Sequence, residues 1–300
     1  MVKSKKEIFK AILVLMPSVV LLAVFVYGFI LWTFRVSLSA WRGIVPDYTF
    51  VGFKNYIKVF QSVRFQTDMW NTFYFTILLL VFCISFALML AHVLDKGVKF
   101  ESTFRSVFLF PIALSFVVTG VVWRWIFNPE VGINVLIHKL GFKDFNFGWY
   151  TQPLRFLNFN VPLVSLLIAA GWQLTGYIMA MFLAGMRAIP QELRDAWVID
   201  GAGELQAFWF VVLPILKPVI LSAGILLGHM SLKLFTLVYN MTGQGPAFAT
   251  DIPALNMFET TFAANRYGEG AMIAIALLLF VAVVIVPYLY SQFRSRGRAA

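Results

Sequence analysis

The chain has 300 residues, of which 60% are hydrophobic and only 13% are charged, and its mean hydropathy is +0.82. A soluble globular protein carries about a quarter charged residues, so this composition excludes that class and predicts a helical membrane protein with several spans. The net charge of +10 is scattered over many loops, which argues against binding to nucleic acid. Cys83 is the only cysteine, so we expect neither an internal disulfide nor a metal site built on thiolates.

Six uncharged stretches predict six transmembrane helices, since a helix needs about 20 apolar residues to cross a bilayer. In chain order they cover residues 11–34, 69–94, 106–123, 156–186, 218–232 and 270–293, and the fifth continues past Lys233. A cleaved signal peptide is the alternative for the first stretch, but that stretch is too long and lacks an obvious small-residue cleavage site. Six spans place both termini on the same side of the membrane.

The basic residues predict which side that is. The segments on the same side as the termini are 1–10, 95–105, 187–217 and 293–300. Lys and Arg are denser in these segments than in those on the other side. Because cytoplasmic segments are richer in Lys and Arg, we expect short cytoplasmic tails at 1–10 and 294–300 around a six-span domain of residues 11–293. The loop of residues 187–218 is then cytoplasmic.

The fourth predicted span contains a polar stripe. Gln173 and Tyr177 are followed at helical spacing by two alanines, Ala180 and Ala184. The amide and the phenol suit a hydroxylated solute, so both residues are candidates for the translocation pathway, and helix packing is an equal alternative for them.

Residues 187–218 form a polar island between two apolar segments. Pro190 suits the first turn of a short helix, and Glu192 lies near the positive end of that helix. Gly201 and Gly203 end this helix, and apolar residues then recur at helical spacing through 205–212. The pattern predicts a helix, a glycine elbow and a second helix, after which the prolines at 214 and 218 bend the chain back into the membrane.

Three parts of this island resemble the EAA loop of ABC-importer permeases, most closely the sugar permeases of the maltose type. They are Asp195-Ala196-Trp197, Asp200-Gly201-Ala202 and Leu213-Pro214. Asp195 replaces the usual Glu, and Trp197 replaces the second Ala. The resemblance implies a type I importer permease fold in which a cytoplasmic coupling helix docks on an ATPase. On it the coupling residues are Pro190, Glu192, Asp195, Ala196, Trp197, Asp200, Gly201 and Pro214. An interfacial amphipathic helix without a partner is the alternative.

The fifth predicted span continues the polar pattern. It places four polar side chains at i, i+4, i+7 and i+11, and therefore on one helical face: His229, Lys233, Thr236 and Asn240. We expect this face to line the pathway. For Lys233 the alternative is a side chain that reaches outward to the membrane boundary. The same stretch, from Lys233 to Pro246, resembles the corresponding stretch of the sugar permeases, with Thr236 in place of an Asp.

The chain contains no motif that could couple transport to an ion gradient or to ATP hydrolysis by itself. The spans carry no Asp or Glu away from their ends, and the chain has no G-x-x-x-x-G-K-[ST] phosphate loop. A secondary carrier or channel is the rival interpretation, but it needs a coupling carboxylate or an internal repeat, and neither is present. A membrane enzyme is disfavoured because the three histidines lie on different segments.

The resemblance covers the chain from about Pro17 to Tyr290 and implies the remaining components. These are a second, homologous permease in a heterodimer, two copies of a cytoplasmic ABC ATPase that binds the ATP, and an extracytoplasmic substrate-binding protein. The chain itself then needs no cofactor and is not an enzyme. It lies in a bacterial or archaeal plasma membrane. The stretch from Met241 to Phe262 most resembles permeases for glucose, mannose or small glycosides.

Overall fold

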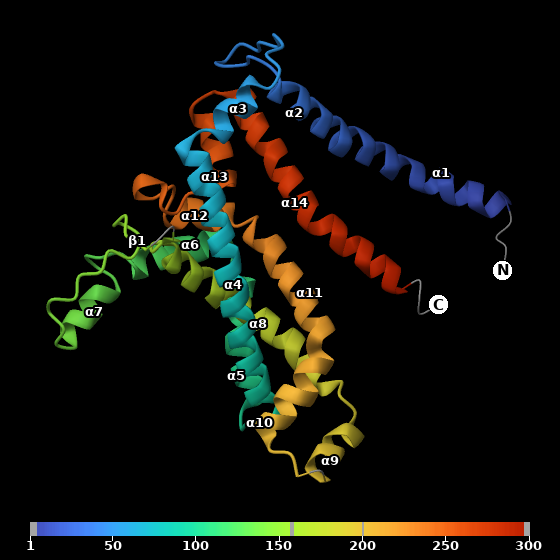
Figure 1. Cartoon of the computed structure of the whole chain (residues 1–300), viewed down its shortest axis with the longest axis vertical. Coiled ribbons are helices and arrows are strands. Elements are labelled where there is room, and N and C mark those ends of the chain that lie inside the picture. Colours follow the sequence, from blue (N-terminus) through green and yellow to red (C-terminus); the bar gives the residue numbers. More distant parts are fainter. Residues whose placement is uncertain (1–4, 157–158, 200, 297–300) are drawn as a thin grey trace. The chain divides into compact units, whose positions relative to one another are not determined.

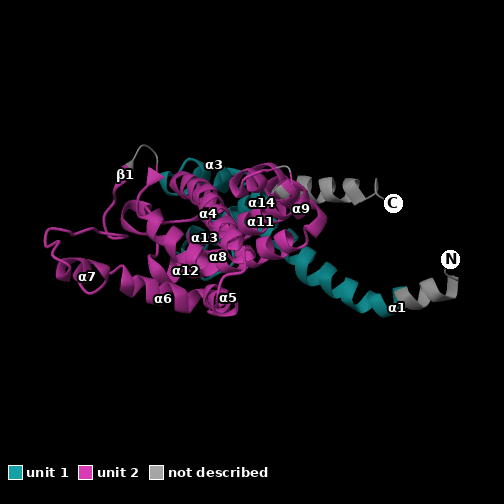
Figure 2. Ribbon diagram, turned by 90° about the horizontal axis from the view of Figure 1, so that it is seen from below, with its two compact units in different colours: residues 1–65, 256–300 teal, residues 66–255 magenta. Residues whose placement is uncertain are grey.

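The computed structural model describes residues 5–156, 159–199 and 201–296. The chain divides into two compact units, residues 1–65 with 256–300 and residues 66–255 (Figure 2). Almost every element in the described residues is a helix. The one sheet among them is the antiparallel pair β1 (Arg155–Phe156) and β2 (Phe159–Asn160). The expected all-α architecture is thus confirmed.

The first unit joins the start of the chain to its end. Its helices are α1 (Lys5–Leu22), α2 (Phe29–Ser37), α3 (Lys54–Phe60) and α14 (Tyr267–Arg296), with π-helical turns η1 (Ala23–Gly28) and η5 (Glu259–Ala263). The helix α13 (Pro253–Phe258) leads into η5. Within this unit α2 packs against α14 (Figure 1). The apolar side chains from residue 12 to residue 31 are mostly exposed, as suits a helix surrounded by lipid or by another chain.

The second unit is built around α8 (Leu163–Arg187), whose inner face is fully buried. The helices before it are α4 (Val63–Asp95), α5 (Glu101–Leu109), η2 (Phe110–Ala113), α6 (Phe116–Ile126) and α7 (Ile133–Lys139). Those after it are α9 (Gln191–Ile199), α10 (Glu204–Ala207), η3 (Phe208–Val212), α11 (Leu213–Ser231), α12 (Phe235–Met241) and η4 (Pro246–Phe248). The core joins Leu174, Ile178 and Phe182 of α8 to Leu79 and Cys83 of α4.

Four described helices are long and apolar enough to cross a membrane. They cover Ile12–Ser37, Val63–Asp95, Leu163–Arg187 and Glu204–Ser231. The predicted span over 106–123 is not one continuous helix, because this stretch lies in two helices, Glu101–Ala113 and Phe116–Ile126, that are bent by 102°. Pro111 lies in the 3-10 turn η2, and Ser115 then accepts a hydrogen bond from the Val118 amide at 3.3 Å, which caps a new helix, α6.

The fifth predicted span begins earlier than expected. The helix that contains it starts at Glu204, in the second half of the 187–218 island, and not at residue 218. Pro214 lacks the N–H that an α-helix would use at this point, and the π-helical turn η3 precedes it. The wider turn accommodates the proline, so the chain enters the apolar segment without the expected break.

Backbones approach closely where α8 crosses the end of α5. A Cβ atom added to Gly176 would lie 1.8 Å from the carbonyl oxygen of Phe108 and 3.2 Å from the amide nitrogen of Leu109. No side chain fits between these backbones, so glycine is required at position 176. Tight packing around small residues is the usual way in which membrane helices associate.

Asn71 holds a loop onto the side of α4. Its Nδ2 donates to the carbonyl oxygens of Phe248 and Asp251, both at 2.9 Å, and its Oδ1 accepts from Nδ2 of Asn160 at 2.6 Å. The side chain is buried, so removing it leaves three polar groups without this partner. We expect Asn71→Leu to destabilise the second unit by about 2–3 kcal/mol.

The measurement is the apparent Tm of the purified chain in mild detergent. Asn146→Leu is the control, because Asn146 is exposed and lies in the surface loop after α7. Equal Tm values for wild type and Asn71→Leu would contradict the assigned role.

Candidate functional site

The helix α9 lies at one end of the second unit, between the long helices α8 and α11 (Figure 1). The helix ends at Ile199, and the chain turns at Gly201, whose φ of +70° is in the left-handed region that favours glycine. The Ala202 amide donates back to the Trp197 carbonyl at 3.0 Å, which is the bond of a Schellman motif. The predicted glycine elbow is therefore present. Asp200 lies outside the described residues.

Arg194 fixes α9 to two other helices at once. One Nη donates to Asp95 at 2.9 Å, at the end of α4, and the other approaches the same carboxylate at 3.4 Å. The second Nη also donates to the Met186 carbonyl at 2.7 Å, at the end of α8. The guanidinium lies 6.0 Å from the ring centre of Trp197. The Arg194 and Asp95 side chains are only 24% and 13% exposed, so water screens this pair less than it would a surface pair.

Two more ion pairs connect the same regions. Arg187, the last residue of α8, pairs with Glu101 at 2.8 Å, and Lys96 pairs with Glu204, the first residue of α10. Residues 95–101 therefore contact all three parts of the island: its start, α9 and α10. His92 on the last turn of α4 adds a ring contact to Phe208, with the centres 4.7 Å apart. Through Arg194 the helix α9 therefore contacts α4 and α8, and α8 is in turn paired with α5.

Most of the predicted coupling residues that the structure describes are exposed. Pro190, Glu192, Asp195 and Ala196 are exposed, Trp197 is half-buried, and Pro214 is exposed further along the chain. Asp195 accepts a hydrogen bond from Nε2 of Gln191 at 3.0 Å. Apolar side chains lie beside them, with Leu193 44% and Ile199 84% exposed. An exposed face that mixes carboxylates with apolar side chains is typical of a protein-binding surface.

The pathway candidates on α8 have different surroundings. Gln173 is buried, its Nε2 donates to the Leu114 carbonyl at 2.7 Å, and its Oε1 is buried without a described partner. Tyr177 is 38% exposed. The Leu114 carbonyl lies at the break between η2 and α6, so Gln173 satisfies a backbone group that the bend leaves free.

The prediction of one continuous helical face for the other four candidates is wrong. The helix α11 ends at Ser231, a turn covers residues 232–234, and α12 begins at Phe235. His229 therefore lies on a different helix from Thr236 and Asn240, and exposed Lys233 lies in the turn. Within α12 the Asn240 amide donates to the Thr236 carbonyl at 2.7 Å. Nδ1 of His229 is buried without a described partner.

Comparison with known proteins identifies the family. Residues 72–298 match the family described as the inner membrane component of binding-protein-dependent transport systems. The chain belongs to this family. The match begins in α4 and includes α9, the Gly201 elbow and the region of the Arg194 contacts. Members are transport subunits, so the expectation that the permease is not an enzyme is confirmed.

Three relatives resemble this permease over most of their length. A probable ABC transporter permease of Pyrococcus horikoshii is 38% identical over 96% of this chain and 97% of its own. The xylose/arabinose import permease XacH of Haloferax volcanii is 34% identical, over 93% of this chain and 86% of its own. The trehalose/maltose permease MalF of Thermococcus litoralis is 30% identical, over 93% and 91%.

A solved structure supports the fold. A chain of a bacterial alginate ABC transporter, crystallised with a periplasmic protein that carries an alginate pentasaccharide, matches with a TM-score of 0.77. The alignment covers 97% of this permease and 96% of that chain at 19% identity, so it shows a shared fold. The predicted class, a helical ABC-importer permease of the membrane, is confirmed.

The sequence did not reveal the contacts of Arg194, Asp95 and Glu101. Of the three, only Arg194 bears on the orientation of the loops, since that prediction rests on Lys and Arg. The available signal was that 95–101 and 187–204 both lie on the same predicted side of the membrane and carry charges of opposite sign at their ends. Opposite charges at the ends of adjacent helices favour pairing across them.

Proposed function

We propose that the chain is the permease subunit of an ATP-driven, binding-protein-dependent sugar importer, and that α9 is its coupling helix. The observation that carries this proposal is the placement of α9: a short helix with an exposed outer face, fixed on its inner side to the ends of α4 and α8 through Arg194. The chain has no phosphate loop of its own, so a separate cytoplasmic ATPase binds and hydrolyses the ATP. Movement of the ATPase then displaces α9 and, through its contacts, the spans.

The proposed topology has six spans with both termini in the cytoplasm, as in a type I importer permease. Four of the spans are the long helices. The bent pair of α5 and α6 is another, third in chain order, and the apolar part of α14, Tyr267–Val283, is the last. The Lys and Arg distribution supports this orientation. It places α9 on the same side as the ATPase.

The proposed solute is a neutral sugar. Two of the relatives are named for neutral sugars, XacH for xylose and arabinose and MalF for trehalose and maltose. Amide, phenol and hydroxyl groups at the pathway candidates suit sugar hydroxyls. The candidates are Gln173, Tyr177, His229, Lys233, Thr236 and Asn240. Within the sugars, the resemblance of the stretch from Met241 to Phe262 favours glucose, mannose or a small glycoside.

The proposed assembly contains a second, homologous permease, two copies of the ATPase and an extracytoplasmic binding protein. The family description supports the binding protein, and the alginate transporter was crystallised with its own periplasmic protein. Alternating access then follows from rocking of the spans when the ATPases close. A carrier that works without ATP is not favoured by these relatives.

The experiment is purification of the tagged chain from its native membranes in mild detergent, followed by mass spectrometry of the proteins that accompany it. We expect an ATPase and a second permease with the wild type, and loss of the ATPase from Asp195→Arg. Gly201→Val should also lose it, because a β-branched residue is strained at φ of +70°, whereas Gly201→Asn should retain it.

Asp144→Arg is the matched control, since Asp144 is an exposed carboxylate on the loop after α7. The amount of ATPase that co-purifies with this variant should equal the amount that co-purifies with the wild type. A wild-type chain that purifies alone and transports sugar in ATP-free liposomes would replace the importer proposal with that of a secondary carrier.

A further inference from the structure

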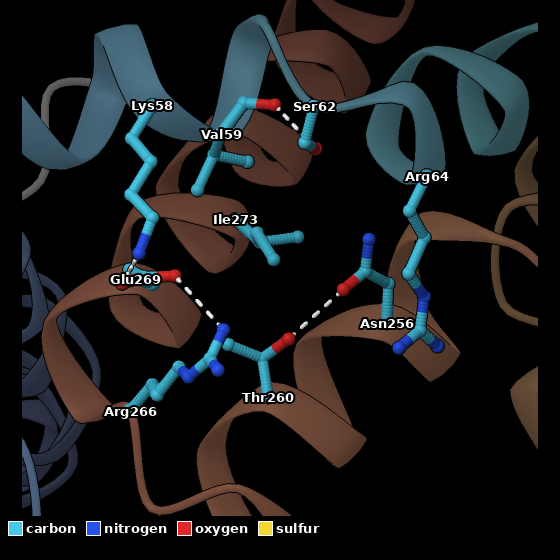
Figure 3. Close-up of a pocket in the computed structure, with 9 residues that line it drawn as sticks. All are labelled: Lys58, Val59, Ser62, Arg64, Asn256, Thr260, Arg266, Glu269 and Ile273. Atoms are coloured by element: carbon cyan, nitrogen blue, oxygen red, sulfur yellow. Dashed lines mark hydrogen bonds and ion pairs between the residues drawn. The ribbon is translucent and has the colours of Figure 1, made fainter.

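A pocket of about 210 Å³, lined mostly by polar and charged residues, lies in the first unit among α3, the start of α4, α13 with η5, and the start of α14 (Figure 3). The residues that line it are Lys58, Val59, Ser62, Arg64, Asn256, Thr260, Arg266, Glu269 and Ile273. In the proposed topology the segments that line this pocket lie on the outer side of the membrane. None of its residues belongs to the coupling surface or to the pathway candidates.

Three cations surround one buried carboxylate at this pocket. Oε1 of Glu269 lies 2.5 Å from Arg42 and 2.7 Å from Lys58, and its Oε2 lies 3.9 Å from Arg266. The Glu269 side chain is 6% exposed, while the three cations are 57%, 50% and 54% exposed. Figure 3 shows Lys58 and Arg266 approaching Glu269 from two different ribbons. Among the described residues the three cations pair with no other carboxylate, so two positive charges are left in excess.

This excess is not needed to hold the fold. The segment that carries Arg42 is already fixed to the start of α14 by backbone bonds: the Gly268 amide donates to the Trp41 carbonyl at 3.0 Å, and the Gly43 amide donates to the Asn265 carbonyl at 2.8 Å. The Trp41 and Tyr267 rings also stack, with centres 4.7 Å apart. One cation would balance the charge of Glu269, and because the three cations are themselves at least half exposed, each additional pair adds only about 0–1 kcal/mol.

We propose that this pocket binds a carboxylate side chain of the extracytoplasmic binding protein and so helps to dock that protein on the permease. The inference rests on the proposed function. The exposed cations around Glu269 attract the carboxylate, and Ser62, Thr260 and Asn256 present further polar groups along the wall. Attraction of this kind raises the association rate and fixes the orientation of the partner.

The shape of the region favours a protein carboxylate over a phospholipid headgroup. A lipid needs an apolar channel for its acyl chains next to the cations. The apolar pocket of this unit, lined by residues such as Trp32, Phe262 and Gly270, lies on a different face of α14, because Gly270 is rotated by about 100° from Glu269. The basic pocket is polar and therefore suits a hydrated partner.

The test uses the complete importer in liposomes and measures ATPase activity as its own purified binding protein is added with solute. We expect Lys58→Glu and Arg266→Glu each to raise the concentration of binding protein for half-maximal stimulation by about tenfold, and to leave the basal ATPase rate unchanged. Lys54→Glu is the matched control, since Lys54 lies one turn away on α3, is exposed and does not line the pocket.

Four outcomes overturn the inference. Unchanged half-maximal concentrations for both pocket variants exclude docking at this site. An equal shift for Lys54→Glu shows general attraction by charge and no role for the pocket. A defect that appears only in liposomes containing phosphatidylglycerol, whatever the amount of binding protein, assigns the pocket to a lipid. A wild-type complex without any ATPase overturns the proposed function and this inference together, whereas the other outcomes leave the proposed function intact.

Discussion

Reversing the charge of Arg194 is expected to uncouple transport from ATP hydrolysis. The substitution Arg194→Asp removes the bonds to Asp95 and to the Met186 carbonyl, and it places two carboxylates side by side. Hydrogen bonds to charged groups contribute about 2 kcal/mol. Losing that amount changes the equilibrium between α9 held against α4 and α8 and α9 released from them by about thirtyfold. We therefore expect sugar uptake by reconstituted importer to fall by about that factor while the ATPase still accompanies the permease.

The double variant Asp95→Arg with Arg194→Asp tests whether the pair itself is responsible. It restores opposite charges between α4 and α9, so uptake should recover several-fold over either single variant. Lys217→Asp is the control for a charge reversal on an exposed cation in the first turns of α11, and it should transport normally. A double variant no better than the singles would contradict transmission through this pair.

Replacing Gly176 is expected to have the largest effect on stability. In Gly176→Ala the added Cβ would lie 1.8 Å from the Phe108 carbonyl oxygen, so α5 and α8 must separate. Overpacking of this kind costs about 3 kcal/mol. Because membrane proteins often unfold irreversibly, the measurement is the half-life of folded protein at a fixed temperature, together with the apparent Tm in detergent.

Gly228→Ala is the matched control for that substitution. Gly228 also lies within a long apolar helix, α11, but nothing lies within 4 Å of a Cβ added there. Alanine forms helix better than glycine by about 1 kcal/mol, so this variant should be as stable as the wild type or more so. Equal losses at both positions would show that the close approach at Gly176 is not responsible.

The island of residues 187–218 could be predicted well because its signals are local. Proline at a first turn and glycine at a helix end act within a few residues, so the short helix and the elbow at Gly201 followed from sequence alone. The Arg194 and Asp95 contact could not be predicted in the same way. It joins positions 99 residues apart, and their proximity depends on how α4, α8 and α9 pack.

The two helix breaks that the sequence did not predict, before α6 and after α11, have a common cause. Apolar runs show which segments avoid water, but they do not show where a helix ends inside an apolar environment. The break before α6 depends on Ser115 as a cap and on Gln173 as a partner for the freed carbonyl, and the end of α11 at Ser231 falls within a run that reads as continuous. The pathway roles of the six candidates remain predictions.

The bond between Gln173 and the Leu114 carbonyl limits how this permease can be redesigned. In a hydrocarbon environment an unsatisfied carbonyl costs several kcal/mol. The free energy of unfolding of a domain is itself only about 5–15 kcal/mol, so a substitution that frees this carbonyl could unfold the protein. An engineer who wishes to change the transported sugar should therefore keep Gln173 and begin at Tyr177, one turn along α8, where the side chain is 38% exposed. Selectivity can then vary while the bent span keeps its shape.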